Sequence, residues 1–289
     1  MSPRLRDAAV AWLAAREPAV VVEVRATRGS VPRETGTRML VSAHHVIGTI
    51  GGGHLEWKAL QRARAMLPAI NPESLFEHYP LGPALGQCCG GSVTLAYSIL
   101  DDGALARWPV APPAMHLQLY GAGHVGRAIA TQLALLDASV DWIDEREAEF
   151  PATTDLGSAW PAHIRRVCVD AVEAEVAQAP PGAFFLVLTH RHDLDLSITE
   201  AILRRADFGF LGLIGSKTKK QRFAHHFERR GIAADSIARV TCPIGIPGIG
   251  GKEPEVIAVA VVAQLLQVAQ TLRASGAGTA LRESAPAIG

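Results

Sequence analysis

The chain has 289 residues, 48% hydrophobic and 19% charged, which is typical of a globular protein with room for two domains. Its 28 basic and 28 acidic residues give a formal net charge of zero, which argues against nucleic acid or an anionic membrane as partner. The N-terminal residues predict an amphipathic helix and no signal peptide. The longest apolar run, 256–263, is shorter than the roughly 20 residues of a membrane span. Four cysteines make no disulfide framework, and we expect a soluble cytoplasmic protein.

The first hundred residues predict a mixed α+β domain. A helix is expected over 5–16, and a second one is opened by Gly51-Gly52-Gly53-His54. Runs rich in apolar and β-branched residues predict strands at 19–26, 37–42, 46–50, 75–81 and 92–100. A segment with three prolines then predicts a linker over 104–114. This gives an N-terminal α+β domain at 1–103.

Beyond the linker, strand and helix patterns alternate as in a doubly wound parallel sheet. The expected strands are 117–120, 140–144, 166–169, 184–189 and 210–214. A long helix is expected over 253–272, and the small, polar residues 274–289 predict a flexible tail. Cys168 lies inside a predicted strand, and we expect it in the core. The second domain should therefore cover 115–273.

The segment Gly121-Ala122-Gly123-His124-Val125-Gly126 carries the spacing Gly-x-Gly-x-x-Gly between a predicted strand and a predicted helix. In dinucleotide-binding folds the first glycine permits the turn, the second admits a phosphate and the third allows close helix packing. The context predicts a Rossmann-like domain whose loop, with His124, binds a phosphate-bearing ligand. An ordinary structural turn is the alternative.

An acid closes the next predicted strand, eighteen residues after the last glycine of the loop. This residue, Asp144, could accept a hydrogen bond from a ribose hydroxyl, as in nicotinamide-binding domains. Arg146, two residues later, could equally contact a phosphate. The pattern leaves open which ligand is bound.

The strand expected at 210–214 is followed by Gly215-Ser216-Lys217, which opens a helix with four cations in its first two turns. Because a helix N-terminus is itself partially positive, cations there are locally unfavourable. We therefore expect a negative group, such as a bound phosphate, to compensate them. A solvated basic face is the alternative.

Two other glycine-rich helix openings are candidate binding loops. One contains Gly250, Gly251 and Lys252 and follows a proline-rich segment, a composition that specifies an unusual backbone path. The other contains Gly52, Gly53 and His54 in the N-terminal domain. Adjacent thiols at Cys88 and Cys89 also lie among glycines, where one exposed thiolate could bind a soft metal or handle sulfur. A buried cysteine is the alternative.

Taken together, these loops resemble the xanthine dehydrogenase accessory protein family, XdhC/CoxI. The matching stretches occur in family order at 27–33, 48–56, 85–91, 120–126, 212–217 and 242–254. The CoxI-like branch often has cysteine after its glycine pair, whereas this chain has His54. A cysteine ligand is therefore not expected at that position.

The resemblance implies a molybdenum cofactor chaperone without turnover of its own. Such a protein binds the phosphate-bearing pyranopterin, shields it while a cysteine desulfurase helps to install a terminal sulfur, and inserts it into apo xanthine dehydrogenase. The resemblance also implies a homodimer. The glycine loops would hold the cofactor, and a thiolate of Cys88, Cys89 or Cys242 would lie near molybdenum or its sulfur.

An oxidoreductase that uses NAD(P) at the Gly121–Gly126 loop is the alternative function. His190 or Lys217 could then serve as the proton donor beside a nicotinamide. This hypothesis leaves the separate N-terminal Gly/Cys domain unexplained.

Overall fold

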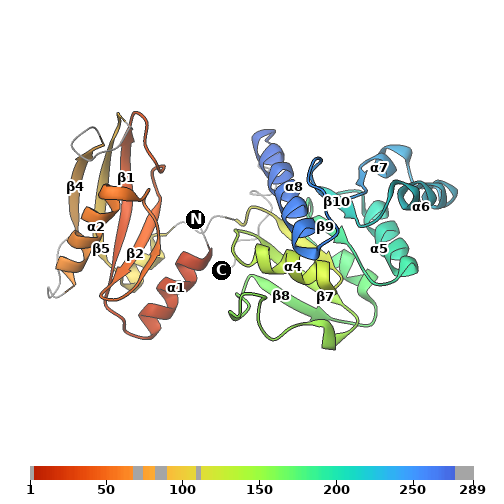
Figure 1. Ribbon diagram of the computed structural model, residues 1–289, viewed down its shortest axis with the longest axis horizontal. Helices are drawn as coiled ribbons and strands as arrows, with labels where there is room; N and C mark the ends of the chain where they lie inside the picture. Colours follow the sequence, from red (N-terminus) through yellow and green to blue (C-terminus); the bar gives the residue numbers. More distant parts are fainter. Residues whose placement is uncertain (1–2, 68–73, 82–89, 109–111, 277–289) are drawn as a thin grey trace. The chain divides into compact units, whose positions relative to one another are not determined.

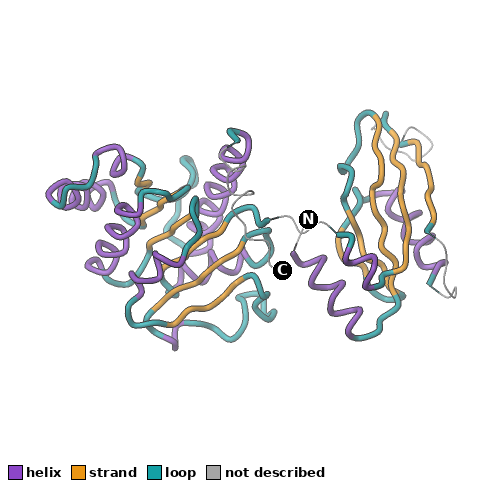
Figure 2. The backbone as a smooth tube through the Cα atoms, turned by 180° about the vertical axis from the view of Figure 1, so that it is seen from behind, coloured by secondary structure: helices purple, strands orange, loops and turns teal. Residues whose placement is uncertain are grey.

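The computed structural model describes residues 3–67, 74–81, 90–108 and 112–276. The chain divides into two compact units, Met1–Ala111 and Pro112–Gly289 (Figures 1 and 2). The first contains an antiparallel sheet and the second a parallel one, each with helices against it. This confirms the predicted α/β class.

The first unit has a five-stranded sheet in the order β3-β2-β1-β5-β4, in which all neighbours are antiparallel. Its elements are α1 (Pro3–Ala14), β1 (Ala19–Arg28), β2 (Arg38–Ser42), β3 (Val46–Gly48), α2 (Gly53–Met66), β4 (Leu75–Pro80), β5 (Ser92–Ile99) and α3 (Asp102–Ala106). Alternation along β1 sorts its side chains between two cores. Val20, Val22 and Val24 pack towards α2, whereas Ala19 and Val21 pack towards α1.

The linker predicted over 104–114 is too long at its N-terminal end. Asp101 caps α3 by accepting a hydrogen bond from the backbone N of Ala104, and Ala104 is buried. Trp108 is also buried, in the same core as α1. The prolines dominate the sequence pattern here, but a short capped helix and one large apolar side chain tie 102–108 to the first unit. Residues 109–111 lie outside the described part.

The second unit has a six-stranded parallel sheet in the order β11-β10-β9-β6-β7-β8. Its strands are β6 (His116–Tyr120), β7 (Ser139–Asp144), β8 (Ile164–Cys168), β9 (Phe184–Val187), β10 (Phe210–Leu213) and β11 (Val240–Thr241). Its helices are α4 (His124–Leu133), η2 (Glu147–Glu149), η3 (Val172–Gln178), α5 (His192–Arg205), α6 (Lys217–Arg229), α7 (Ala234–Ala238) and α8 (Pro254–Ala274).

Helices cover both faces of this sheet (Figure 1). α4 and α8 pack on one face, while η3, α5, α6 and α7 pack on the other. Strands β9 and β10 are buried at every residue, as their continuous apolar sequence predicted. The arrangement is the doubly wound sheet expected from the sequence.

Two expectations change at the edges of this unit. Cys168 ends the edge strand β8 and is exposed, so its predicted place in the core is wrong, because an edge strand has a neighbour on only one side.

Helix α8, with 21 residues, is long and apolar enough to cross a membrane by length and composition. It nevertheless packs against α4, and its residues Ala258, Val261 and Leu265 are buried in the core of the unit. The predicted tail lies outside the described residues from 277 onward.

Candidate functional site

The turn between β6 and α4 contains the three glycines of the predicted phosphate loop, and they serve different purposes. Gly121 has a φ of 119°, and a Cβ there would lie 2.4 Å from the carbonyl oxygen of Leu188. A Cβ at Gly126 would lie 2.0 Å from the carbonyl oxygen of Gly121. Both positions therefore require glycine for packing. A Cβ at Gly123 would meet nothing within 4 Å, and the adjacent His124 is exposed, so this part of the loop faces open space.

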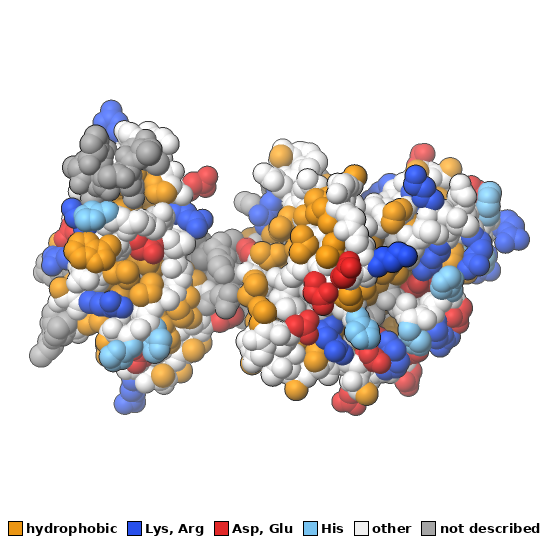
Figure 3. Space-filling model, in the orientation of Figure 1, with side chains coloured by type: hydrophobic (Ala, Val, Ile, Leu, Met, Phe, Trp, Pro, Cys, Tyr) orange, Lys and Arg blue, Asp and Glu red, His pale blue; other side chains and the backbone are white. Residues whose placement is uncertain are grey.

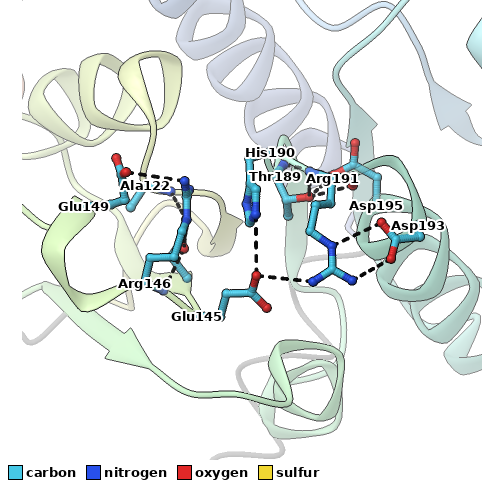
Figure 4. Close-up of polar contacts among 10 residues, drawn as sticks. Ala122, Glu145, Arg146, Glu149, Thr189, His190, Arg191, Asp193 and Asp195 are labelled. Carbon is cyan, nitrogen blue, oxygen red and sulfur yellow. Dashed lines mark hydrogen bonds and ion pairs between the residues drawn. The ribbon is translucent and has the colours of Figure 1, made fainter.

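Asp144, at the end of β7, does not offer its carboxylate to solvent. Its side chain is 3% exposed, and it accepts hydrogen bonds from the backbone N of Ala122 (2.7 Å) and from Arg146. Arg146 donates its backbone N, Nε and Nη2, each at 2.9 Å (Figure 4). Burial opposes ionisation, but these hydrogen bonds prevail and hold the pKa of Asp144 below its ordinary value. The expected acceptor for a ribose hydroxyl is therefore already engaged.

Glu145 connects the ends of β7 and β9. Its Oε1 lies 3.6 Å from Nε2 of His190 and 3.5 Å from Nη1 of Arg191, which also pairs with Asp193 (Figure 4). Because β6 lies between β7 and β9, these contacts span the end of β6. This is the switch point of the doubly wound sheet, the place at which such sheets bind ligands.

An open cavity of about 340 Å³ lies at the carboxyl ends of β9 and β10. Both α5 and α6 begin beside it. Its lining residues are Thr189, His190, His192, Asp195, Ile214, Gly215, Ser216 and Lys219. Of the predicted site residues, Gly215 and Ser216 line the cavity, and Lys217 is the exposed residue that follows.

A buried ion pair forms one wall of this cavity. Lys219 Nζ donates to Asp195 Oδ2 at 2.5 Å and to the carbonyl oxygen of Ile214 at 2.9 Å. Asp195 Oδ1 accepts from the backbone N (2.9 Å) and Oγ1 (2.7 Å) of Thr189. The Lys219 and Asp195 side chains are only 9% and 1% exposed. The negative group expected to compensate the cations of α6 is thus, for Lys219, a protein carboxylate.

The other cations at the start of α6 have no such partner among the described residues. Lys217, Lys220 and Arg222 make no ion pair there, and the first turn of α6 has no acidic residue. Arg222 Nη2 instead lies 3.0 Å from Nδ1 of His192. A guanidinium has only donors, so the imidazole nitrogen accepts this hydrogen bond. Figure 3 shows Lys and Arg side chains gathered on this part of the second unit.

The loop with Gly250, Gly251 and Lys252 is exposed, and it is organised by its own neighbours. The backbone N of Lys252 donates to Glu253 Oε2 at 2.9 Å. Gly251 has a φ of 137°, and a Cβ there would lie 2.7 Å from the same oxygen, so the conformation requires glycine. None of the three lines the cavity described above.

The loop with Gly52, Gly53 and His54 belongs to the first unit. Glu56 accepts hydrogen bonds from the backbone N of Ile50 and of Gly52, both at 3.1 Å, which holds the turn at the start of α2. His54 is exposed and stacks on Trp57, with ring centroids 5.4 Å apart. The structure thus gives these glycines a local structural role, while His54 remains on the surface.

The candidate sulfur ligands are in different situations. Cys88 and Cys89 lie outside the described residues. Cys242 is buried in the core with Phe223 and Phe227, and its Sγ lies 3.6 Å from the carbonyl oxygen of Ser216. Burial raises the pKa of the Cys242 thiol, despite the nearby lysines. This environment favours the thiol and does not suit the exposed thiolate predicted from sequence.

Comparison with known proteins identifies the family to which the chain belongs. The model of the XdhC Rossmann domain matches residues 117–265, which is more than half of the chain, and the model of the XdhC and CoxI family matches residues 12–80. The chain belongs to the XdhC and CoxI family. The predicted resemblance is confirmed, and both units fall within the family's pattern.

Two individual proteins are similar to this XdhC and CoxI family member. The uncharacterized protein YqeB of Escherichia coli (strain K12) is 31% identical over 261 residues, or 87% of the chain. The chain spans only 43% of that protein's length. The solved structure of a protein named xanthine dehydrogenase from Bacillus halodurans has a TM-score of 0.71 and 18% identity, and it covers 94% of this chain and 96% of its own. At that identity the likeness establishes the shared fold.

Sequence reasoning missed part of the cavity in this family member. Lys219 is one of the four cations that the sequence places at the start of a helix, but its partner Asp195 lies inside α5, and the pairing depends on where α5 and α6 begin. An acid one turn into α5 and a lysine one turn into α6 are the only local signals, and both are also common on solvated helix faces.

Proposed function

We propose that this protein binds the molybdenum cofactor and takes part in xanthine dehydrogenase maturation, protecting the cofactor during sulfuration and inserting it into the apo enzyme. The observation that carries the proposal is the carboxyl edge of the parallel sheet in a chain of this family. A glycine loop and a basic cavity lie there on neighbouring strands. Both features suit an anionic ligand.

The cofactor is cargo in this proposal. It is a pyranopterin with a phosphate, and its dithiolene carries the molybdenum. Among the described residues no three His, Cys, Asp or Glu side chains come together to hold a metal ion, so the described part would bind the pterin and its phosphate. Contacts to molybdenum or its sulfur would come from the Cys88-Cys89 loop in preference to the buried Cys242.

Maturation requires partners, and the proposal names three. A cysteine desulfurase would supply the sulfur, and the molybdenum subunit of apo xanthine dehydrogenase would receive the cofactor. A second copy of this chain would complete a homodimer in the cytoplasm. The name of the Bacillus halodurans protein of the same fold agrees with a link to xanthine dehydrogenase.

The alternative, an NAD(P)-dependent oxidoreductase, is weakened by one observation. In nicotinamide-binding domains an acid after the second strand accepts hydrogen bonds from a ribose diol. Here both oxygens of Asp144 already accept from Ala122 and Arg146. Ribose binding would have to displace a well-formed ion pair.

Titration of the full chain with purified molybdenum cofactor, NAD(H) and NADP(H) tests the proposal. Binding can be followed by quenching of the five tryptophans. We expect saturable quenching by the cofactor and none by the dinucleotides. Tight dinucleotide binding without affinity for the pterin would reverse the ranking. Alanine variants of Cys88, Cys89 and Cys242, with the exposed Cys168→Ala as control, then report which thiol retains the sulfurated cofactor.

A further inference from the structure

The two regions that the sequence suggests for phosphate binding differ in their electrostatics. Beside the glycine loop lie the carboxylates of Asp144, Glu145 and Glu149, and the exposed Glu147 stands between the last two in the chain. The Arg146 guanidinium donates hydrogen bonds to both Asp144 and Glu149. Because these acids offset the nearby cations, little net positive potential remains for a phosphate beside the glycine loop.

The cavity beside β9 and β10 has the opposite balance. Its buried acid, Asp195, is neutralised by Lys219, and the nearby Asp193 is paired with Arg191. Glu145 faces His190 and Arg191 from β7. No carboxylate among the described residues pairs with Lys217 or Arg222, which stand within the first two turns of α6. A net positive charge is therefore left beside this cavity.

We propose that the anionic group of the ligand is held at the cavity, by His192 of its lining and by Lys217 and Arg222 beside it at the start of α6, and not on the glycine loop. The chemistry recognised is a phosphate monoester or diphosphate. The proposal rests on the proposed function only for the identity of the cargo, whose phosphate would occupy this place. The glycine loop would then contact an uncharged part of the ligand through the open space at Gly123.

Two side chains that line the cavity, His192 and Lys219, already make hydrogen bonds within the protein. Since Nδ1 of His192 accepts from Arg222, the imidazole carries its proton on Nε2, and His192 lines the cavity. Lys219 also lines the cavity with a side chain nine-tenths buried. Its ammonium has three donors, and the described residues accept two hydrogen bonds from it. An imidazole and a buried lysine therefore line one space, and the Arg222 guanidinium is hydrogen-bonded to that imidazole.

The size of the cavity also suits an organic phosphate. Its volume of about 340 Å³ lies at the lower end of the roughly 300–1,000 Å³ of ligand pockets. The starts of α5 and α6 both open on it, which adds to the attraction for an anion. The start of α6 follows β10, which β9 separates from β6 and its glycine loop.

Calorimetric titration of the full chain with inorganic pyrophosphate tests the placement. Lys217→Ala and Arg222→Ala should each weaken binding about tenfold, because each removes a charge-assisted contact. Gly123→Ala is the matched arm for the glycine loop: its φ is −68° and the added methyl meets nothing within 4 Å, so the fold tolerates it while a phosphate there would be obstructed. Arg229→Ala, at the exposed far end of α6, controls for loss of a charge.

Weakening by Lys217→Ala and Arg222→Ala, with Gly123→Ala and Arg229→Ala unchanged, would support the placement. Weakening by Gly123→Ala alone would overturn it and place the anion on the loop. Equal weakening by Arg229→Ala would mean that only the overall charge matters, which would overturn the placement. Wild-type protein that fails to bind pyrophosphate would also overturn it.

Repeating the titration with the molybdenum cofactor separates this inference from the proposed function. If all variants bind the cofactor as tightly as the wild type, the function stands and the placement of its phosphate fails. If pyrophosphate binding follows the expected pattern but the cofactor does not bind, the anion site stands and the proposed cargo is wrong.

Discussion

The glycine loop and the cavity beside α6 are neighbours at one edge of one sheet, yet they are stabilised in opposite ways. Around the loop, backbone atoms approach so closely that Gly121 and Gly126 are required by packing, and an acid, Asp144, ties the turn to Arg146. Around the cavity, the structure is stabilised by side chains, through the ion pair between Asp195 and Lys219. A phosphate-binding sequence pattern can therefore mark a packed turn, while the cations to which we assign anion binding stand at the start of α6, after β10.

The largest loss of stability is expected when the ion pair beside the cavity is broken. Asp195→Ala leaves the Lys219 ammonium buried without its partner, which should lower the free energy of unfolding by about 3–5 kcal/mol. Urea denaturation of the full chain measures it. In the double variant with Lys219→Met, much of the loss should return, because no buried charge remains. A double variant as unstable as Asp195→Ala would contradict the assignment of the cost to the unpaired ammonium.

Gly126→Ala should destabilise the loop through packing alone. The new Cβ would lie 2.0 Å from the carbonyl oxygen of Gly121, which is backbone and cannot move aside. We expect a loss of about 3 kcal/mol in the free energy of unfolding, at the upper end of overpacking effects. A loss below about 1 kcal/mol would show that α4 can shift away from the turn.

Asp144→Asn tests the electrostatic contribution to the loop. The pKa of Asp144 is lowered in the folded chain, so its contribution is present above the unfolded value of about 3.9 and is lost as the pH falls through the folded pKa. At pH 7 the variant should lose about 1–2 kcal/mol of unfolding free energy. That difference should shrink below about pH 4. A difference that stays constant from pH 7 to pH 3 would contradict the ion pair, and Asp170→Asn, at an exposed acid, is the control.

The smallest effect is expected for Gly123→Ala. Its backbone suits an L-residue and its Cβ would face open space, so the free energy of unfolding should change by no more than about 0.5 kcal/mol. Thermal unfolding beside Gly126→Ala provides the comparison. A loss as large as that of Gly126→Ala would mean that all three glycines serve packing and that none is free to admit a ligand.

The sequence by itself determined most of the fold. The β-branched run of β1, the continuous apolar runs of β9 and β10 and the glycine spacing after β6 are local signals, and each led to the correct element. Packing of the loop could also be anticipated, because a turn that needs positive φ at Gly121 leaves few residue types possible.

Only the tertiary structure decided which polar groups meet. Cys168 is exposed because β8 is an edge strand, and strand order cannot be read from one strand's own sequence. Asp144 is engaged by Arg146 instead of offering itself to a ribose, and Lys219 is neutralised by Asp195, 24 residues earlier. The Asp195–Lys219 pair depends on long-range packing of α5 against α6, whereas the Asp144–Arg146 pair joins near neighbours whose side-chain directions the sequence does not specify. Residue type and spacing mark these groups as candidates, but geometry assigns each to a protein partner or leaves it for a ligand.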